Sequence, residues 1–124
     1  MPNDIRIQLT TSSTFALKAI RRGLYEDDES KLAKELVEVA LGRSQAITVL
    51  AVSGTTYMGC GLCMLDGELL IYVLPRYRGR RIGSKIIKRF SDYREGNRAG
   101  FFAVLDEKSG GLEKFWAHNQ IQIK

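Results

Sequence analysis

The stretch from Glu68 to Phe90, ELLIYVLPRYRGRRIGSKIIKRF, constrains the fold of this chain more than any other part of the sequence. It begins with an apolar run at 69–74, rich in strand-forming residues, which predicts a buried strand. The run breaks at Pro75 and passes into a loop rich in arginine and glycine. An amphipathic pattern follows, with apolar residues at helical spacing at Ile82, Ile86, Ile87 and Phe90. The sequence therefore predicts a strand, a basic loop and a helix in direct succession.

This succession is typical of an anion-binding site. The first N–H groups of a helix have no partner inside the helix, and the helix dipole adds partial positive charge there. Gly79 and Gly83 allow the backbone to approach a ligand closely and to take turn conformations. The loop adds four arginines whose charges suit phosphate oxygens: Arg76, Arg78, Arg80 and Arg81. We therefore predict a phosphate or pyrophosphate site in this loop.

The same residues carry a family resemblance. The segment RGRRIGSKII resembles the acetyl-CoA loop of the GNAT superfamily of N-acetyltransferases, whose pattern is Gln/Arg-x-x-Gly-x-Gly/Ala after a strand and before a helix. Arg78 takes the first position of this pattern and Gly83 the last, whereas Arg81 replaces the middle glycine. The resemblance implies that acetyl-CoA binds as the co-substrate, with its pyrophosphate on Arg78, Gly79, Arg80, Arg81, Ile82, Gly83 and Ser84.

Hydrophobic periodicity and turn residues predict the element order β-α-α-β-β-β-α-β-α-β. The predicted strands cover 4–9, 46–52, 57–65, 69–74, 101–105 and 121–124, and the predicted helices cover 11–24, 30–41, 83–95 and 112–118. The resemblance implies this order for nearly the whole chain, as an α/β fold with a mixed, mostly antiparallel sheet flanked by helices. A chain of 124 residues has room for one such domain, spanning 1–124.

The positive charge is concentrated around the predicted loop. Residues 76–98 hold nine Lys and Arg against two acids, a net charge of +7, and the remainder holds ten against twelve, a net of −2. Such a local excess favours a single polyanionic ligand over a broad nucleic-acid surface. No apolar run is long enough for a membrane span, and MPNDIRIQ does not have the pattern of a signal peptide, so we expect a cytoplasmic location.

The two cysteines, Cys60 and Cys63, form a CxxC inside the apolar segment YMGCGLCML. A zinc site needs about two more ligands, and the single histidine, His118, is far away in the sequence. Redox CxxC motifs sit in a turn that opens a helix, whereas this segment is predicted to be a strand, in which positions three apart face opposite sides. We therefore expect two structural thiols and no metal.

The resemblance also implies how the rest of the co-substrate is held. In the family, the fourth and fifth strands splay apart, the pantetheine arm enters the gap, and a backbone N–H on the fourth strand binds the acetyl carbonyl. By position, Val73 and Leu74 supply that backbone here. The family usually closes with a further β-hairpin, for which only 120–124 remain, and a homodimer that completes the sheet is one arrangement consistent with this.

Glu68 and Tyr72 are the candidate catalytic residues. Glu68 matches the place of the general-base glutamate in histone-type members, and its alternative role is to close an Asp-Gly-Glu turn. Trp116 stands where many members have a tyrosine that acts as general acid. Tyr72 shares a strand face with Glu68 and is a candidate substitute, unless it is a core residue. Ser109 matches an asparagine of the family that binds the pantetheine, and His118 is expected at the helix surface.

In the resembled family, the connection between the first two helices lies beside the acceptor end of the cleft. Here that connection is the acidic run Glu26, Asp27, Asp28 and Glu29. A negative rim would attract an amine that arrives as an ammonium ion. The alternative is a solvated loop whose acids favour the N-terminus of the next helix.

Two functions fit these observations. The first is an N-acetyltransferase that moves an acetyl group from acetyl-CoA to a protein lysine, an N-terminus or a small cationic amine. The second is a catalytically degenerate module of the same fold that binds a protein partner. A nucleic-acid binder fits less well, because the basic segment has few interleaved aromatic residues beyond Tyr77 and Tyr93.

Overall fold

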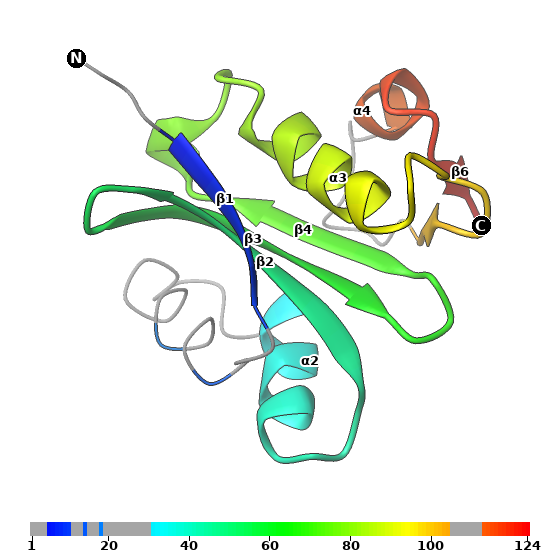
Figure 1. Cartoon of the computed structure of the whole chain (residues 1–124), viewed down its shortest axis with the longest axis horizontal. Coiled ribbons are helices and arrows are strands. Elements are labelled where there is room, and N and C mark those ends of the chain that lie inside the picture. Colours follow the sequence, from blue (N-terminus) through cyan, green and yellow to red (C-terminus); the bar gives the residue numbers. More distant parts are fainter. Residues whose placement is uncertain (1–4, 11–13, 15–17, 19–30, 105–112) are drawn as a thin grey trace.

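The structure is a computed structural model that describes residues 5–10, 14, 18, 31–104 and 113–124 (Figure 1). The predicted first helix apart from residues 14 and 18, the acidic run at 26–29 and Ser109 lie outside the described residues. None of the helices in the described part of the chain is long and apolar enough to cross a membrane.

Four antiparallel strands form the main sheet in the order β1-β2-β3-β4. Their bounds are β1 Ile5–Thr10, β2 Ala46–Ser53, β3 Thr56–Met64 and β4 Leu69–Val73. The turn between β3 and β4 is closed by Asp66, whose Oδ1 accepts a hydrogen bond from the Glu68 N–H at 3.0 Å. Gly67 follows with a φ of 101°, as an Asp-Gly turn requires. The predicted hairpin is therefore confirmed.

A second, smaller sheet pairs β5 Phe102–Ala103 with β6 Gln122–Ile123 in parallel. Among the described residues, it meets β4 through a single parallel bridge between Glu68 and Phe102. The turn before β4 is also pressed against the chain before β5, since a Cβ on Gly67 would collide with the carbonyl oxygen of Gly100. The two sheets are thus joined where β4 begins, and β5 does not follow β4 along its length.

Helices cover both faces of the main sheet (Figure 1). α2 Lys31–Ala40 packs on one face, whereas α3 Ile82–Tyr93 and the short α4 Glu113–His118 lie on the other. The α3 face of the core is filled by fully buried side chains, among them Ile86, Ile87 and Phe90. Burying each of these residues contributes about 1.5–3 kcal/mol. The strong apolar stripe of α3 therefore fixes this helix against the sheet.

The cysteines occupy opposite faces of β3, as predicted from their spacing. Cys60 belongs to the core cluster under α2, and Cys63 belongs to the cluster under α3. Both are free thiols, and burial raises the pKa of each, to about 11 for Cys63. Within the described residues, no group of three or more His, Cys, Asp or Glu side chains is placed to hold a metal ion. The prediction that the CxxC lies on a strand, with its two cysteines on opposite faces, is confirmed.

The described elements follow the predicted order, with corrections at their ends. The strands β1 to β4 and the helix α3 agree with the predicted ranges to within two residues. The largest difference is at β5, which pairs only at Phe102–Ala103 rather than over 101–105. Phe101 is buried in the core instead, because its ring packs with the α3 cluster. An apolar run alone does not distinguish strand pairing from core packing.

Candidate functional site

The strand β4 leads directly into the predicted anion-binding loop. After β4, a 3-10 turn at Pro75–Tyr77 reverses the chain, with the Tyr77 N–H donating to the Leu74 carbonyl oxygen at 2.9 Å. We call the segment 76–81 the arginine loop. In it, Gly79 and Arg81 take left-handed backbone conformations, with φ of 83° and 61°. α3 begins at the next residue, so the predicted strand, loop and helix are all present.

Arg81 stands at the position where the family pattern has its middle glycine, and it adopts the conformation that glycine favours. Its φ of 61° and ψ of 23° are left-handed, which costs a residue with a side chain about 1–2 kcal/mol. Arg81 is also the N-cap of α3, and no side chain caps the helix by a hydrogen bond. The loop thus keeps a glycine-like shape, and the first N–H groups of α3 lack a side-chain acceptor.

The arginines of the loop are exposed and are held in place by two tyrosines. The guanidinium of Arg78 lies 5.4 Å from the Tyr72 ring, and its Nε donates to the Val73 carbonyl oxygen at 2.9 Å. Arg76 and Arg80 lie 5.2 Å and 5.7 Å from the ring of Tyr77. Cation–π contacts of this kind contribute about 0.5–1 kcal/mol at exposed sites. The structure therefore brings Tyr72, Val73 and Arg78 together, and it keeps three cations beside the start of α3.

Among the residues that the structure describes, the edge of β4 that faces away from β3 is bridged only at Glu68, where β4 begins. Antiparallel pairing alternates residues that bond the partner strand with residues whose N–H and C=O point away from it. The Leu74 N–H donates to the Met58 carbonyl oxygen at 2.9 Å, so the amides of Ile71 and Val73 point to the other side, toward β5. The predicted role of Leu74 is corrected here, because both of its backbone groups are used within the protein.

Glu68 lies at the opposite end of β4 from the arginine loop. Its N–H is bound by Asp66, and its carbonyl oxygen accepts from the Met64 N–H at 2.9 Å, so its backbone closes the turn. The residue is only 9% exposed. Five residues separate it from Val73, which is roughly 16 Å along an extended strand. Glu68 and Tyr72 fall on the same face of β4 by alternation, and Tyr72 packs in the core cluster under α2.

The helix α4 departs from the family pattern in a way that packing explains. Trp116 is buried, and its ring meets that of Phe115 edge-on with centroids 5.1 Å apart. Phe115 in turn fills the space beside Gly83, where a Cβ would come within 2.9 Å of its ring. Gly83 therefore makes room for α4, and its predicted contact with the co-substrate stays a prediction. His118 is exposed, as expected.

Sequence reasoning did not find the roles of Phe115 and Ile71. The contact between Gly83 and Phe115 joins residues 32 positions apart in the sequence, and no local sequence pattern predicts it. The outward amide of Ile71 depends on the pairing register of β4 with β3, which hydrophobic alternation leaves open. The only sequence signal for Phe115 is its place in the aromatic pair Phe115-Trp116 within the predicted helix.

At the level of sequence, no family model and no curated protein matches the chain. Solved structures do match its fold over nearly its whole length. The aminoglycoside N-acetyltransferase AAC(6')-Iy in complex with CoA superposes with a TM-score of 0.65 and 9% identity, over 98% of this chain and 91% of that chain.

Two further structures give the same result. A GNAT-family acetyltransferase from Streptococcus pneumoniae TIGR4 matches with a TM-score of 0.65 and 20% identity, over 96% of this chain and 88% of that one. A predicted acetyltransferase with acetyl-CoA from Clostridium acetobutylicum matches with a TM-score of 0.60 and 14% identity, over 90% and 88%. This chain therefore has the fold of the GNAT N-acetyltransferases.

Proposed function

We propose that this protein is an N-acetyltransferase that moves an acetyl group from acetyl-CoA to an amine. The observation that carries the proposal is the uncapped, glycine-like start of α3 beside the edge of β4, along which the described residues pair no strand beyond Glu68. An anion can supply the acceptors that the first N–H groups of α3 lack. Two of the structural neighbours are complexes with CoA or acetyl-CoA.

In this proposal the pyrophosphate binds the arginine loop and the start of α3. Arg78, Arg80 and Arg81 supply charge, and the backbone from Gly79 through Ile82 and Gly83 to Ser84 supplies the N–H groups. The pantetheine arm lies along this edge of β4, with Ser109 as a further contact. The outward amide of Val73 or Ile71 donates to the acetyl carbonyl oxygen and polarises it.

The chemical step needs a neutral amine. Its nitrogen attacks the acetyl carbonyl carbon, the carbon–sulfur bond breaks, and CoA leaves as the thiolate. Glu68 accepts the proton from the amine through bridging water, because it lies at the end of β4 opposite to Val73. Tyr72 is the proposed donor to the thiolate, because the indole of Trp116 is buried and is not a useful acid. The acidic run Glu26, Asp27, Asp28 and Glu29 would attract a cationic acceptor.

A second candidate is a catalytically inactive module that binds a protein partner. The burial of Trp116 at the place of the family's tyrosine favours it. The two candidates separate in turnover: an inactive module releases no free CoA thiol from acetyl-CoA with any amine acceptor.

Thermal unfolding with added CoA tests the proposed binding site. CoA at a hundred times its dissociation constant should stabilise the fold by about 2.7 kcal/mol. The Arg80→Ala variant should bind CoA more weakly without unfolding, because Arg80 is an exposed loop residue. Arg89→Ala, a variant on α3 outside the arginine loop, is the matched control. An unchanged unfolding temperature of the folded protein at saturating CoA concentrations would remove the proposal.

A further inference from the structure

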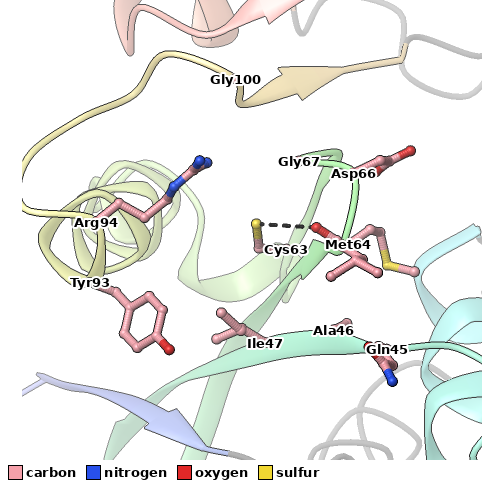
Figure 2. Close-up of a pocket in the computed structure, with 11 residues that line it drawn as sticks. Gln45, Ala46, Ile47, Cys63, Met64, Asp66, Gly67, Tyr93, Arg94 and Gly100 are labelled. Carbon is pink, nitrogen blue, oxygen red and sulfur yellow. Dashed lines mark hydrogen bonds between the residues drawn. The ribbon is translucent and has the colours of Figure 1, made fainter.

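A pocket of about 420 Å³ lies at the end of α3 that is opposite to the arginine loop. Its walls come from the start of β2, the end of β3, the turn at 65–67, the last turn of α3 and Gly100 (Figure 2). None of these residues belongs to the site proposed for acetyl-CoA. α3 has twelve residues, so roughly 18 Å of helix separate the two places. The volume is within the range that holds small-molecule ligands, about 300–1,000 Å³.

The floor of the pocket is apolar and carries no charge near neutral pH. Ile47 and Ala46 come from β2, and Cys63, from β3, lies above Ile47 in Figure 2. Burial raises the pKa of the Cys63 thiol to about 11, so the thiol stays protonated. Its Sγ is 3.7 Å from the Met64 carbonyl oxygen, to which it donates a weak hydrogen bond. The ring of Tyr93 adds an exposed apolar wall.

One cation lies at the edge of this floor. The guanidinium of Arg94 is 4.7 Å from the ring of Phe101, and a Cβ on Gly100 would be 3.7 Å from both of its terminal nitrogens. These contacts orient the guanidinium. Within the part of the chain that the structure describes, the ion pairs join Arg43 with Glu38 and Lys88 with Asp92, and none involves Arg94.

The acid in the pocket wall is directed elsewhere. Asp66 binds the Glu68 N–H through Oδ1, and Figure 2 shows its carboxylate pointing away from the pocket, whereas the Arg94 side chain comes from the opposite wall. Both charges act on Cys63, since Arg94 lowers the pKa of that thiol and Asp66 raises it. The pocket is therefore polarised, and an anion is favoured at the Arg94 side only.

We propose that this pocket binds a small organic anion with an apolar body, independently of acetyl-CoA. The carboxylate of such a ligand pairs with Arg94, whose planar guanidinium can donate two parallel hydrogen bonds. The apolar body lies over Ile47 and Cys63 and is flanked by Tyr93. An aromatic or short branched carboxylate matches both the pocket's volume and the single cation, Arg94, in its wall.

Titration of the full chain with sodium benzoate, followed by amide chemical shifts, tests the proposal. The amides of Ile47, Cys63, Gly67 and Gly100 should move and saturate below about 10 mM. Benzamide, the neutral isostere, should bind at least about tenfold more weakly, because it carries no negative charge to pair with the guanidinium. Shifts that do not saturate, or equal binding of benzamide, would overturn the proposal.

Two variants assign the anion to Arg94. Arg94→Gln should weaken benzoate binding by about tenfold or more, whereas Arg89→Gln, on the same helix and outside the pocket, should leave it unchanged. The same spectra report whether each variant is folded. If Arg94→Gln does not fold, Arg94→Lys carries the test, since it keeps the charge but loses the paired donors and should bind several-fold more weakly. Equal affinity in these variants would overturn the assignment. The rise in unfolding temperature on adding CoA should be the same in the Arg94 variants as in the unsubstituted protein, which separates this site from the proposed function.

Discussion

The unit formed by β4, the arginine loop and α3 carries positive charge at both of its ends, but the charge has a different origin at each end. At the loop end, exposed arginines surround a helix start whose backbone N–H groups have no side-chain cap, and the backbone there is left-handed at Gly79 and Arg81. At the turn end, a single guanidinium, that of Arg94, stands beside an apolar pocket. The loop end is therefore suited to a ligand with several charges, and the turn end to a ligand with one.

The difference also decides which substitutions each end tolerates. The loop end depends on backbone geometry, so changes that alter φ or fill the space beside Gly83 affect it more than the loss of one charge. The turn end depends on buried side chains, because Glu68, at the bridge between the two sheets, and Cys63 are both buried. The predictions below test this contrast from both sides.

The largest effect is expected for Glu68→Gln. If Glu68 accepts the amine proton, turnover should fall by about a hundredfold or more while CoA affinity stays nearly constant. Initial rates of CoA release and a thermal titration with CoA measure the two quantities separately. Unchanged turnover would leave Glu68 with its turn-closing role alone, and a matching loss of CoA affinity would place it in ligand binding.

Cys63 should react with iodoacetamide about a hundredfold more slowly than an unperturbed thiol at pH 8, because burial raises its pKa to about 11 and the thiolate is the nucleophile. The rate should rise about tenfold per pH unit up to that value. Measurement in a Cys60→Ala variant isolates the site, and a fast reaction at pH 8 would contradict the burial of the thiol.

The same pKa shift sets the direction of a stability change. Burial favours the protonated Cys63 thiol in the folded chain. Below pH 9.0, the ordinary pKa of the thiol, the folded and unfolded chains both keep this proton, so the free energy of unfolding does not change with pH through this group. As the pH rises from 9 toward 11, the unfolded chain loses this proton first, and the folded state should lose stability faster than in Cys63→Ala. Urea unfolding at pH 7 and pH 10 compares the two proteins.

Gly83→Ala should destabilise the fold by about 1–3 kcal/mol through overpacking, since its Cβ would lie 2.9 Å from the Phe115 ring. In a Phe115→Leu background, Gly83→Ala should cost less stability than it does in the unsubstituted protein, because the smaller side chain leaves room for the new Cβ. A double-mutant cycle by urea unfolding measures the coupling. Additive effects would show that Gly83 and Phe115 do not restrict each other.

The smallest effect is expected for Arg81→Gly. Glycine takes the left-handed conformation at φ 61° without a side-chain clash, so folding stability should rise by up to about 1 kcal/mol. Arg81→Ala removes the same charge but keeps a Cβ, and it should show no such gain. CoA affinity in the two variants then separates the contribution of the charge from that of the loop shape. Equal stability of the glycine and alanine variants would contradict the strain at Arg81.

Much of this molecule follows from local sequence. The apolar stripe of α3, the alternation in β1 and the opposite faces of Cys60 and Cys63 all depend on periods of 3.6 and 2, which the sequence displays directly. The position of the arginine loop between β4 and α3 follows from the same patterns. These features are set by neighbours along the chain.

The parts that sequence reasoning missed are set by neighbours in space. The identity of the outward β4 amides changes if pairing with β3 shifts by one residue, and the Leu74–Met58 hydrogen bond decides it. The burial of Trp116 and the contact of Phe115 with Gly83 depend on where α4 packs on α3. Residues 26–29 and Ser109 lie outside the described residues, so their roles stay predictions.

The close approach of Gly67 to Gly100 bears on where this chain can be lengthened. Surface turns generally accept inserted residues, and Gly54 in the β2–β3 turn has nothing within 4 Å of an added Cβ. Gly67 in the β3–β4 turn has the backbone of Gly100 against it instead. One hairpin can therefore carry a tag, an epitope or a fused domain, whereas the other has to keep its length and its glycine for the two sheets to remain in contact.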